Sequence, residues 1–380
     1  MLQLGRLSTS DQDIYYVLYS TTVKLMITLL VCGEVWYGFT ETSSLDEVAA
    51  TINVTVIQFI TIYRYKNMLE HKDFYKKLAT AMESPYFDIS TEKRRKLVDF
   101  WSQTNERYLK LLLALGNCTL AAWFIFPLLD EVEYNLIVGV RLPFYYKTVF
   151  LYPVAYIIVV IAFTYISHFV MVTDLIMQTH LMHLLCQFTV LADCFENLLD
   201  DCKVGFKAEN NLVYNKSFAD KYTKRLRDLV QQHQLILSHT MNMRDTLSSP
   251  MLGQLAASGT LICFVGYQAT TTIAESIAKC LMSFLFLGYN IFELYIICRW
   301  CEEITNRSKQ IGESIYCSGW ECGVGRLPGV RSTIMFVIAR ANKPLFLTAG
   351  GMYNLTLTSY SILVKTSYSA LTMLLRFRHE

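Results

Sequence analysis

Residues 344–376, PLFLTAGGMYNLTLTSYSILVKTSYSALTMLLR, form the last long apolar stretch of the chain. The stretch exceeds the roughly 20 residues that a helix needs to cross a bilayer. Several polar side chains recur within it at steps of three, four or seven residues, which places them on one face of a helix. This face, which we name the polar stripe, carries the polar residues Thr356, Ser359, Thr366, Ser369 and Arg376 together with the apolar Met373.

A polar face on a membrane helix is explained in one of two ways. The hydroxyl groups can hold the helix against neighbouring helices, or the face can line a path for water. Leu355 and Ile362 interrupt the stripe, so the pattern alone does not choose between them. A single helix cannot enclose a path, so the second interpretation requires several copies or partners.

The composition is that of a membrane protein. Of the 380 residues, 53% are hydrophobic and only 17% are charged, whereas soluble domains carry about 25% charged residues. The eleven cysteines lie mostly in apolar or helical segments, which is typical of reduced, buried thiols. The net charge of +2 gives no argument for nucleic-acid binding, and we expect none.

Seven apolar stretches predict an all-α fold with seven transmembrane helices. They cover approximately 14–39, 48–68, 109–129, 149–172, 251–273, 280–299 and 345–364. With basic residues at span ends counted with the adjoining loop, 27 of the 34 Lys and Arg lie on the side of the N-terminus and 6 on the other side. Basic residues favour the cytoplasm, so we expect an intracellular N-terminus and an extracellular C-terminus.

Long helical extensions are expected on the cytoplasmic side, at approximately 69–108, 173–250 and 300–343. From His180 onward, apolar residues recur at steps of three and four: Leu181, Leu184, Phe188, Leu191, Phe195 and Leu198. Such a stripe favours an anchor bundle over solvated linker helices. The whole chain, 1–380, is therefore interpreted as one seven-helix subunit, with residues 344–376 as a candidate pore helix.

Aromatic residues at the outer ends of the spans suggest a ligand pocket. The candidate ligand-binding residues are Thr119, Trp123, Tyr152, Tyr156, Phe284 and Tyr289. A pocket between these helices would be mostly apolar, with a few hydroxyl groups to orient a ligand. The alternative is an interfacial aromatic belt, which would explain Tyr152 without any ligand.

Other motifs carry less weight. Cys298, Cys301, Cys317 and Cys322 have nearly the spacing of a zinc site, but Cys298 ends a membrane helix, so we expect no metal. The chain has no nucleophile elbow, phosphate loop or pair of catalytic carboxylates, and we expect neither an enzyme nor a cofactor. Glu106-Arg107-Tyr108 is similar to the triplet of G-protein-coupled receptors but precedes its span instead of following it.

Three segments near the C-terminus resemble the signature of insect odorant receptors: Tyr316–Trp320, Lys343–Gly351 and Ile362–Ser369. Gly319 stands where that family commonly has Asp. The ending differs from that of the related gustatory receptors. A long insertion between spans four and five, typical of the odorant co-receptor, is absent, so the chain resembles a ligand-tuned receptor.

This resemblance implies an odorant-gated, poorly selective cation channel in the plasma membrane of sensory neurons. Such receptors form heterotetramers with co-receptor subunits around a central pore built by the last helices. The small volatile odorant binds among spans two, three, four and six, and the anchor bundle holds most subunit contacts. Met373 aligns near the apolar constriction of the pore and Arg376 at its extracellular mouth. A gustatory-type channel, a G-protein-coupled receptor, a transporter and a membrane enzyme are the alternatives.

Overall fold

The computed structural model describes residues 14–40, 45–81, 87–129, 134–206, 214–271 and 277–379. Its helices are α1 (Ile14–Thr40), α2 (Leu45–Glu70), α3 (Lys72–Thr80), α4 (Glu92–Leu129), α5 (Tyr152–Glu196), α6 (Leu198–Lys203), α7 (Lys216–Thr271), α8 (Ile277–Tyr316), α9 (Val330–Ala341) and α10 (Leu357–His379). Two short 3-10 helices, Trp320–Cys322 and Val324–Arg326, precede α9, and the two-residue strands β1 (Thr348–Ala349) and β2 (Tyr353–Asn354) precede α10.

Among the described residues, the seven predicted spans fall on seven long helices: α1, α2, α4, α5, α7, α8 and α10. Five of them, α1, α4, α5, α7 and α8, are long and apolar enough to cross a membrane by length and composition. The other two, α2 and α10, are not among these five, and charged side chains such as Arg64 in α2 and Lys365 in α10 interrupt their apolar sequences.

The last helix begins later than the sequence predicts. Residues 345–356 form a small antiparallel hairpin, in which Thr348 pairs with Asn354 and Ala349 with Tyr353. Gly350 and Gly351 adopt left-handed backbone angles, φ 61° and 69°, that only glycine accepts readily. This turn, following Pro344, ends any continuous helix. The predicted helix 344–376 is therefore too long at its N-terminal end, because α10 starts at Leu357.

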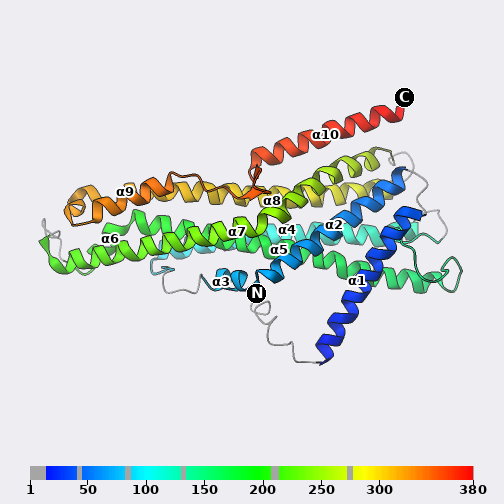
Figure 1. The fold of residues 1–380 in the computed structure, drawn as a ribbon, viewed down its shortest axis with the longest axis horizontal. Coiled ribbons are helices and arrows are strands. Elements are labelled where there is room, and N and C mark those ends of the chain that lie inside the picture. The colour runs from blue at the N-terminus through cyan, green and yellow to red at the C-terminus, as the bar shows by residue number, and fades with distance from the viewer. Residues whose placement is uncertain are drawn as a thin grey trace.

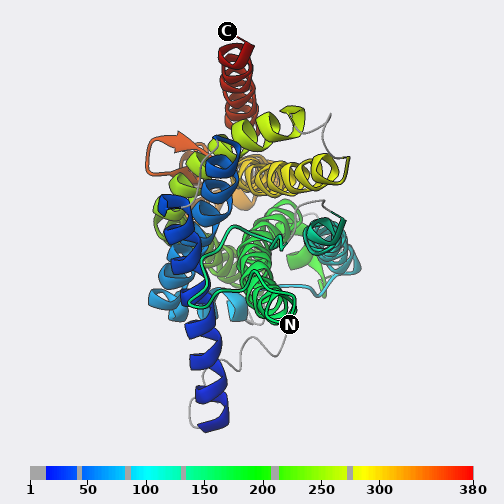
Figure 2. The same cartoon turned by 90° about the vertical axis from the view of Figure 1, so that its right-hand side faces the viewer.

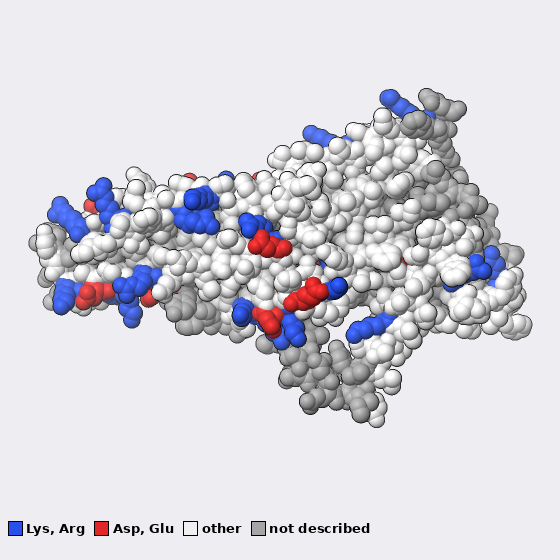
Figure 3. All heavy atoms as spheres, viewed as in Figure 1, with Lys and Arg blue, Asp and Glu red and all other residues white. Residues whose placement is uncertain are grey.

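Three helices run along most of the molecule. The 45 residues of α5 extend about 67 Å at 1.5 Å per residue, more than twice the thickness of a hydrocarbon core of about 30 Å. In Figure 1, α5, α7 and α8 lie along the long axis, and α6 and α9 lie at the narrow end. Figure 2 shows α10 projecting from the body beyond α7. Most charged side chains on the face in Figure 3 gather over the narrow half.

The narrow half is a helical bundle with a continuous apolar core, which we name the distal bundle. It consists of residues 180–203 of α5 and α6, 216–244 of α7, 299–316 of α8, and α9. The six apolar residues that the sequence places on one stripe of this region are fully buried: Leu181, Leu184, Phe188, Leu191, Phe195 and Leu198. Their side chains form the core against α7, α8 and α9.

A buried arginine ties the start of α4 to the distal bundle. The Arg94 guanidinium donates to Asp88 at 2.8 Å, to Asp193 at 2.9 Å and to Asp201 at 2.6 Å. Arg94 is almost completely buried, and three carboxylates compensate its charge. Since an unpaired buried charge is costly, this arrangement fixes the position of α4 on α5 and α6.

Candidate ligand-binding site

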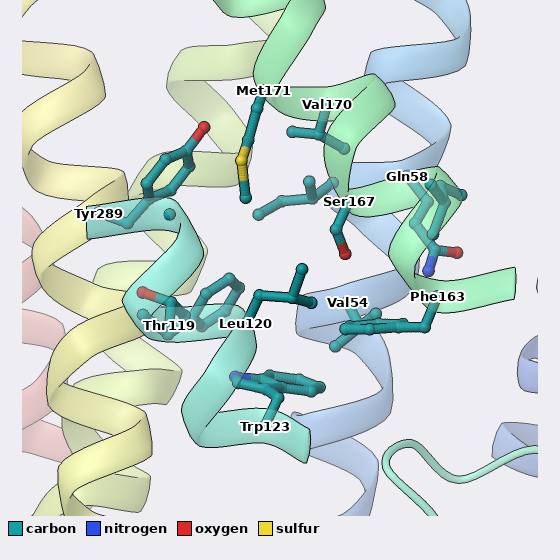
Figure 4. Close-up of a pocket in the computed structure, with 14 residues that line it drawn as sticks. Val54, Gln58, Thr119, Leu120, Trp123, Phe163, Ser167, Val170, Met171 and Tyr289 are labelled. Atoms are coloured by element: carbon teal, nitrogen blue, oxygen red, sulfur yellow. The ribbon is translucent and has the colours of Figure 1, made fainter. Parts of the chain in front are cut away.

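A cavity lies between four helices in the wide half of the molecule (Figure 4). Its volume is about 80 Å³, several times the space that one water molecule needs. The lining residues come from α2, α4, α5 and α8: Val54, Ile57, Gln58, Gly116, Thr119, Leu120, Trp123, Phe163, Ile166, Ser167, Val170, Met171, Phe286 and Tyr289. These helices are the second, third, fourth and sixth of the predicted spans, the same four that the family resemblance implies.

Aromatic rings form one end of the cavity. The Trp123 ring stacks on Phe163, with 5.2 Å between the ring centroids, and meets the edge of Phe286 at 5.7 Å. Stacked and edge-to-face aromatic pairs are favourable beyond their buried area, so this end of the cavity is firmly built.

A glycine allows three helices to approach one another beside the cavity. A Cβ atom at Gly116 of α4 would lie 2.8 Å from the Met171 side chain of α5 and 3.2 Å from the Tyr289 ring of α8. Any larger residue at Gly116 would therefore displace one of these side chains. Only glycine at this position leaves room for both.

Two hydroxyl groups in the cavity wall already donate hydrogen bonds within the protein. The Thr119 hydroxyl donates to the Leu115 carbonyl oxygen at 2.8 Å. The Tyr289 hydroxyl donates to Asp174 at 3.1 Å and points away from the cavity centre in Figure 4. From Tyr289, a bound molecule would therefore meet mainly the aromatic ring.

Other polar groups at the cavity can still form a hydrogen bond with a ligand. Gln58 donates from Nε2 to Glu34 of α1 at 3.2 Å, and its Oε1 atom has no partner among the described residues. The Trp123 indole N–H is also buried and without an acceptor in the described part of the chain. Ser167 directs its hydroxyl into the cavity (Figure 4). Since buried polar groups are normally hydrogen-bonded, these atoms suit a ligand that carries a polar group.

A buried ionic cluster lies next to the cavity. Arg64 of α2 pairs with Asp174 of α5, and its second amino group lies 3.0 Å from the amide oxygen of Gln254 in α7 and 3.5 Å from Glu293 in α8. The Gln254 amide donates to both Glu293 oxygens, at 3.3 and 3.4 Å. We use "ionic cluster" for Arg64, Asp174, Gln254 and Glu293.

The structure brings three of the predicted ligand-binding residues, Thr119, Trp123 and Tyr289, together around the cavity. Three others do not line it. The Tyr152 and Tyr156 hydroxyls donate to the carbonyl oxygens of Asn135 and Phe124, each at 2.6 Å. Phe284 is 53% exposed on the outer side of α8.

The geometry of the helices explains why Tyr156 and Phe284 do not line the cavity. Tyr156 and Phe163 are seven residues apart and share a face of α5, but the cavity begins two turns further along the helix at Phe163. Phe286, two positions after Phe284, points to the opposite side of α8 and into the cavity. Sequence reasoning also missed Gln58, Ser167 and Met171. Ser167 and Met171 lie four and eight residues after Phe163, a helical spacing that could have suggested them.

The candidate pore residues divide into two groups. Thr356 directly precedes α10 and Ser359 lies in its first turn, where the Ser359 backbone N–H donates to the Thr356 hydroxyl at 3.2 Å. Thr366, Ser369, Met373 and Arg376 lie on the exposed face of α10, and Met373 is 64% exposed. The opposite face packs on α7, with Leu371 beside Gly266 and Leu363 beside Gly259. The uncovered face of α10 therefore carries four residues of the polar stripe, whereas Thr356 and Ser359 are half-buried.

Comparison with known proteins identifies the chain. A family model described as "7tm Odorant receptor" matches residues 44–368. The chain belongs to this family of insect odorant receptors. It is accordingly a multi-pass membrane protein of a receptor family that has no enzymatic activity.

Individual relatives agree. The receptor is 25% identical to Odorant receptor 13a of Drosophila melanogaster over 302 residues, which cover 76% of this chain and 68% of the relative. It is 21% identical to Odorant receptor 94a of the same species over 369 residues, 94% of this chain and 88% of the relative.

A solved structure shares the fold. The structure of the insect olfactory receptor OR5 from Machilis hrabei in complex with eugenol matches with a TM-score of 0.81 and 15% identity, over 98% of this chain and 92% of that chain. A second structure of the same receptor matches with a TM-score of 0.80 and 16% identity, over 97% of this chain and 92% of that chain. The predicted all-α, seven-transmembrane fold is confirmed.

Proposed function

We propose that this odorant receptor is the ligand-tuned subunit of a ligand-gated, poorly selective cation channel. It assembles with odorant co-receptor subunits into a heterotetramer in the plasma membrane of sensory neurons. Its N-terminus and distal bundle lie in the cytoplasm, and its C-terminus lies outside the cell. The proposal rests on the observation that the same chain has both an apolar cavity among four spans and a last helix with an uncovered polar face.

The cavity favours a small, largely apolar ligand with one hydrogen-bonding group. Its walls are aromatic and aliphatic except for Gln58, Thr119 and Ser167. Ser167 and the unpartnered Trp123 indole N–H suit an oxygen atom of a hydroxyl, ether or carbonyl group. A volatile aromatic compound with one oxygen substituent meets these requirements.

In this proposal, the uncovered face of α10 faces the central pore. The Thr366 and Ser369 hydroxyls donate to backbone carbonyl oxygens of their own helix, at 2.7 and 3.0 Å, and still present oxygen atoms to water. Met373 lies at the apolar constriction of this pore, and Arg376 lies at its extracellular mouth. Four copies of this chain would place four cationic Arg376 side chains in the pore, and these would oppose cation passage. In the heterotetramer, the co-receptor subunits therefore dominate conduction.

The energy that gating requires is small. A ligand opens the channel only if it binds the open arrangement more tightly than the closed one. A tenfold shift of that equilibrium needs about 1.4 kcal/mol of differential binding. Burial of one aromatic ring supplies a free energy of about this size or larger, ~1.5–3 kcal/mol.

Current recordings test the function. Cells expressing this chain with the co-receptor should respond to members of a panel of volatile aromatics that includes eugenol, and cells expressing the co-receptor alone should not. Both should respond to a co-receptor agonist. A complete lack of volatile-evoked current across the panel, with normal surface expression, would contradict the proposal.

Aqueous accessibility tests the pore assignment. Cysteines introduced one at a time at Thr366, Ser369 and Met373 should react with a membrane-impermeant thiol reagent and alter the current, whereas cysteines at the buried positions Leu371 and Ser367 should not. If positions on the polar stripe stay unreactive even with ligand present, α10 does not line the pore.

A further inference from the structure

The ionic cluster joins four helices at one point inside the molecule. Arg64 belongs to α2, Asp174 to α5, Gln254 to α7 and Glu293 to α8, and their side chains are 0–6% exposed. One guanidinium group thus holds two carboxylates and an amide from three other helices. No helix among these four can shift without changing a hydrogen bond or ion pair of the cluster.

Burial makes the cluster sensitive to such shifts. A buried charge is tolerated only while it is paired and hydrogen-bonded, and the loss of one partner leaves the other exposed to the full desolvation penalty. The cluster therefore favours a small number of discrete arrangements of α2, α5, α7 and α8 over a continuous range. This is the property that a two-state coupling element requires.

One residue belongs to both the cavity and the environment of the cluster. The Tyr289 ring lines the cavity, and its hydroxyl donates to Asp174 at 3.1 Å, on the carboxylate oxygen that does not pair with Arg64. Met171, which also lines the cavity, stands one turn before Asp174 on α5. Any ligand that moves the Tyr289 ring therefore changes the hydrogen bonding of a buried carboxylate.

The cluster also connects to the last helix. Gln254 lies on α7, and one to three turns further along the same helix Gly259 and Gly266 contact Leu363 and Leu371 of α10. In the preceding turns of α7, the Ser248 carbonyl oxygen accepts a hydrogen bond of 2.7 Å from the Gly350 N–H, in the hairpin that leads into α10. A shift of α7 at Gln254 is thus transmitted to both the start and the middle of α10.

We propose that Tyr289 and the ionic cluster transmit ligand occupancy from the cavity to α10. Tyr289 is a positioning residue: ligand contact with its ring changes its hydrogen bond to Asp174, and the rearranged cluster shifts α7 together with α10. The inference deepens the proposed channel function and rests on it.

The first test removes only the Tyr289 hydroxyl. Tyr289→Phe keeps the ring in the cavity wall, so a residue that only lines the cavity would tolerate it. We expect the ligand concentration for half-maximal current to change at least tenfold and the unliganded current to change as well, with surface expression and the co-receptor agonist response retained. Tyr63→Phe is the matched control, because its hydroxyl also joins two helices, to Ser249 at 3.0 Å, outside the cluster.

The second test asks whether Tyr289 acts through Asp174. Asp174→Asn keeps the shape of the side chain and removes its charge. If the hydrogen bond carries the coupling, the double variant Tyr289→Phe/Asp174→Asn should show about the same shift in half-maximal concentration as Asp174→Asn alone. The probe is the panel compound that gives the largest current with the unmodified receptor.

Two results would overturn the inference: less than a twofold change in both readouts for Tyr289→Phe, or additive shifts in the double variant. A receptor without any volatile-evoked current would instead refute the proposed function. The two failures are therefore distinguishable in one set of recordings.

Discussion

The Glu302 carboxylate of α8 accepts a hydrogen bond of 2.7 Å from the backbone N–H of Leu357, the first residue of α10. Helix N-termini carry unsatisfied N–H groups and a partial positive charge, so a carboxylate at this position stabilises the helix start. Glu302 lies on the same helix as Tyr289 and Glu293, nine residues or more further along. The start of α10 is thus attached to the helix that also borders the cavity.

Removal of this contact should loosen the start of α10. Glu302→Ala removes a capping interaction of about 1 kcal/mol, and we expect an altered unliganded current in cells that also express the co-receptor. The neighbouring Glu303→Ala is a matched control, since Glu303 pairs with Arg307 of its own helix at 2.9 Å. Equal currents for Glu302→Ala and Glu303→Ala would show that the cap has no role in gating.

Ser167 should select ligands that carry oxygen. Loss of one neutral hydrogen bond weakens binding by about 0.5–1.5 kcal/mol, which corresponds to about a two- to tenfold higher half-maximal concentration. Ser167→Ala should cause this change for an oxygenated aromatic ligand and little change for a hydrocarbon of similar shape. Thr164→Val, which removes a hydroxyl from α5 that donates to Val160, should affect neither ligand. Equal shifts for both ligands in Ser167→Ala would contradict the assignment.

Trp123 should contribute more than any polar group. Its ring stacks on Phe163 and forms one end of the cavity, and covering an aromatic side chain contributes ~1.5–3 kcal/mol to a binding free energy. We expect Trp123→Ala to abolish or weaken the volatile-evoked current at least tenfold, with the co-receptor agonist current retained. Trp123→Phe should recover part of the response. Equal loss of both currents would indicate a folding defect instead.

Local patterns in the sequence predict the helices well. The burial of Leu181, Phe188 and Leu191 follows from helical spacing alone, because one stripe of a long helix must be covered. Pro344 and Gly350-Gly351 mark the hairpin at 345–356, but the surrounding apolar residues favour a spanning helix when composition is weighed over the whole stretch. Local backbone requirements decide the outcome there.

The cavity is predictable from the sequence only in part. Trp123 and Tyr289 are found because aromatic residues near the ends of spans are conspicuous. Which face each helix turns to its neighbours depends on tertiary packing, so the sequence could not separate Phe286 from Phe284. Arg64, counted with the basic residues at the end of its span, proves to be buried against Asp174 because three other helices converge on it.

The distal bundle should lose stability in acid. Burial, with a smaller contribution from Arg340, lowers the pKa of His233 from 6.5 to about 4, and burial followed by His180 lowers that of His183 to about 4. At a pH between about 4 and 6.5, the unfolded chain binds protons at these two histidines that the folded chain does not bind. The free energy of unfolding therefore falls as pH decreases from about 7 to 4. At pH 5 the loss is ~2 kcal/mol for each histidine.

Thermal unfolding of the detergent-solubilised receptor at pH 7.5 and pH 5 measures this dependence. His233→Gln should reduce the difference between the two midpoints, whereas His71→Gln, at an exposed position, should leave it unchanged. An identical difference in His233→Gln and the unmodified receptor would exclude His233 as a source of the pH dependence.

Met373 should keep the closed pore dry. It is the large apolar side chain near the outer end of the polar stripe, between Ser369 and Arg376, and α7 and α8 leave it exposed. Narrow apolar constrictions gate channels by excluding water, so a hydroxyl at this position favours a wetted, conducting pore. Met373→Ser should therefore raise the unliganded current, whereas Tyr368→Ser, on a different side of α10, should not. An unchanged resting current with normal surface expression would remove Met373 from the gate.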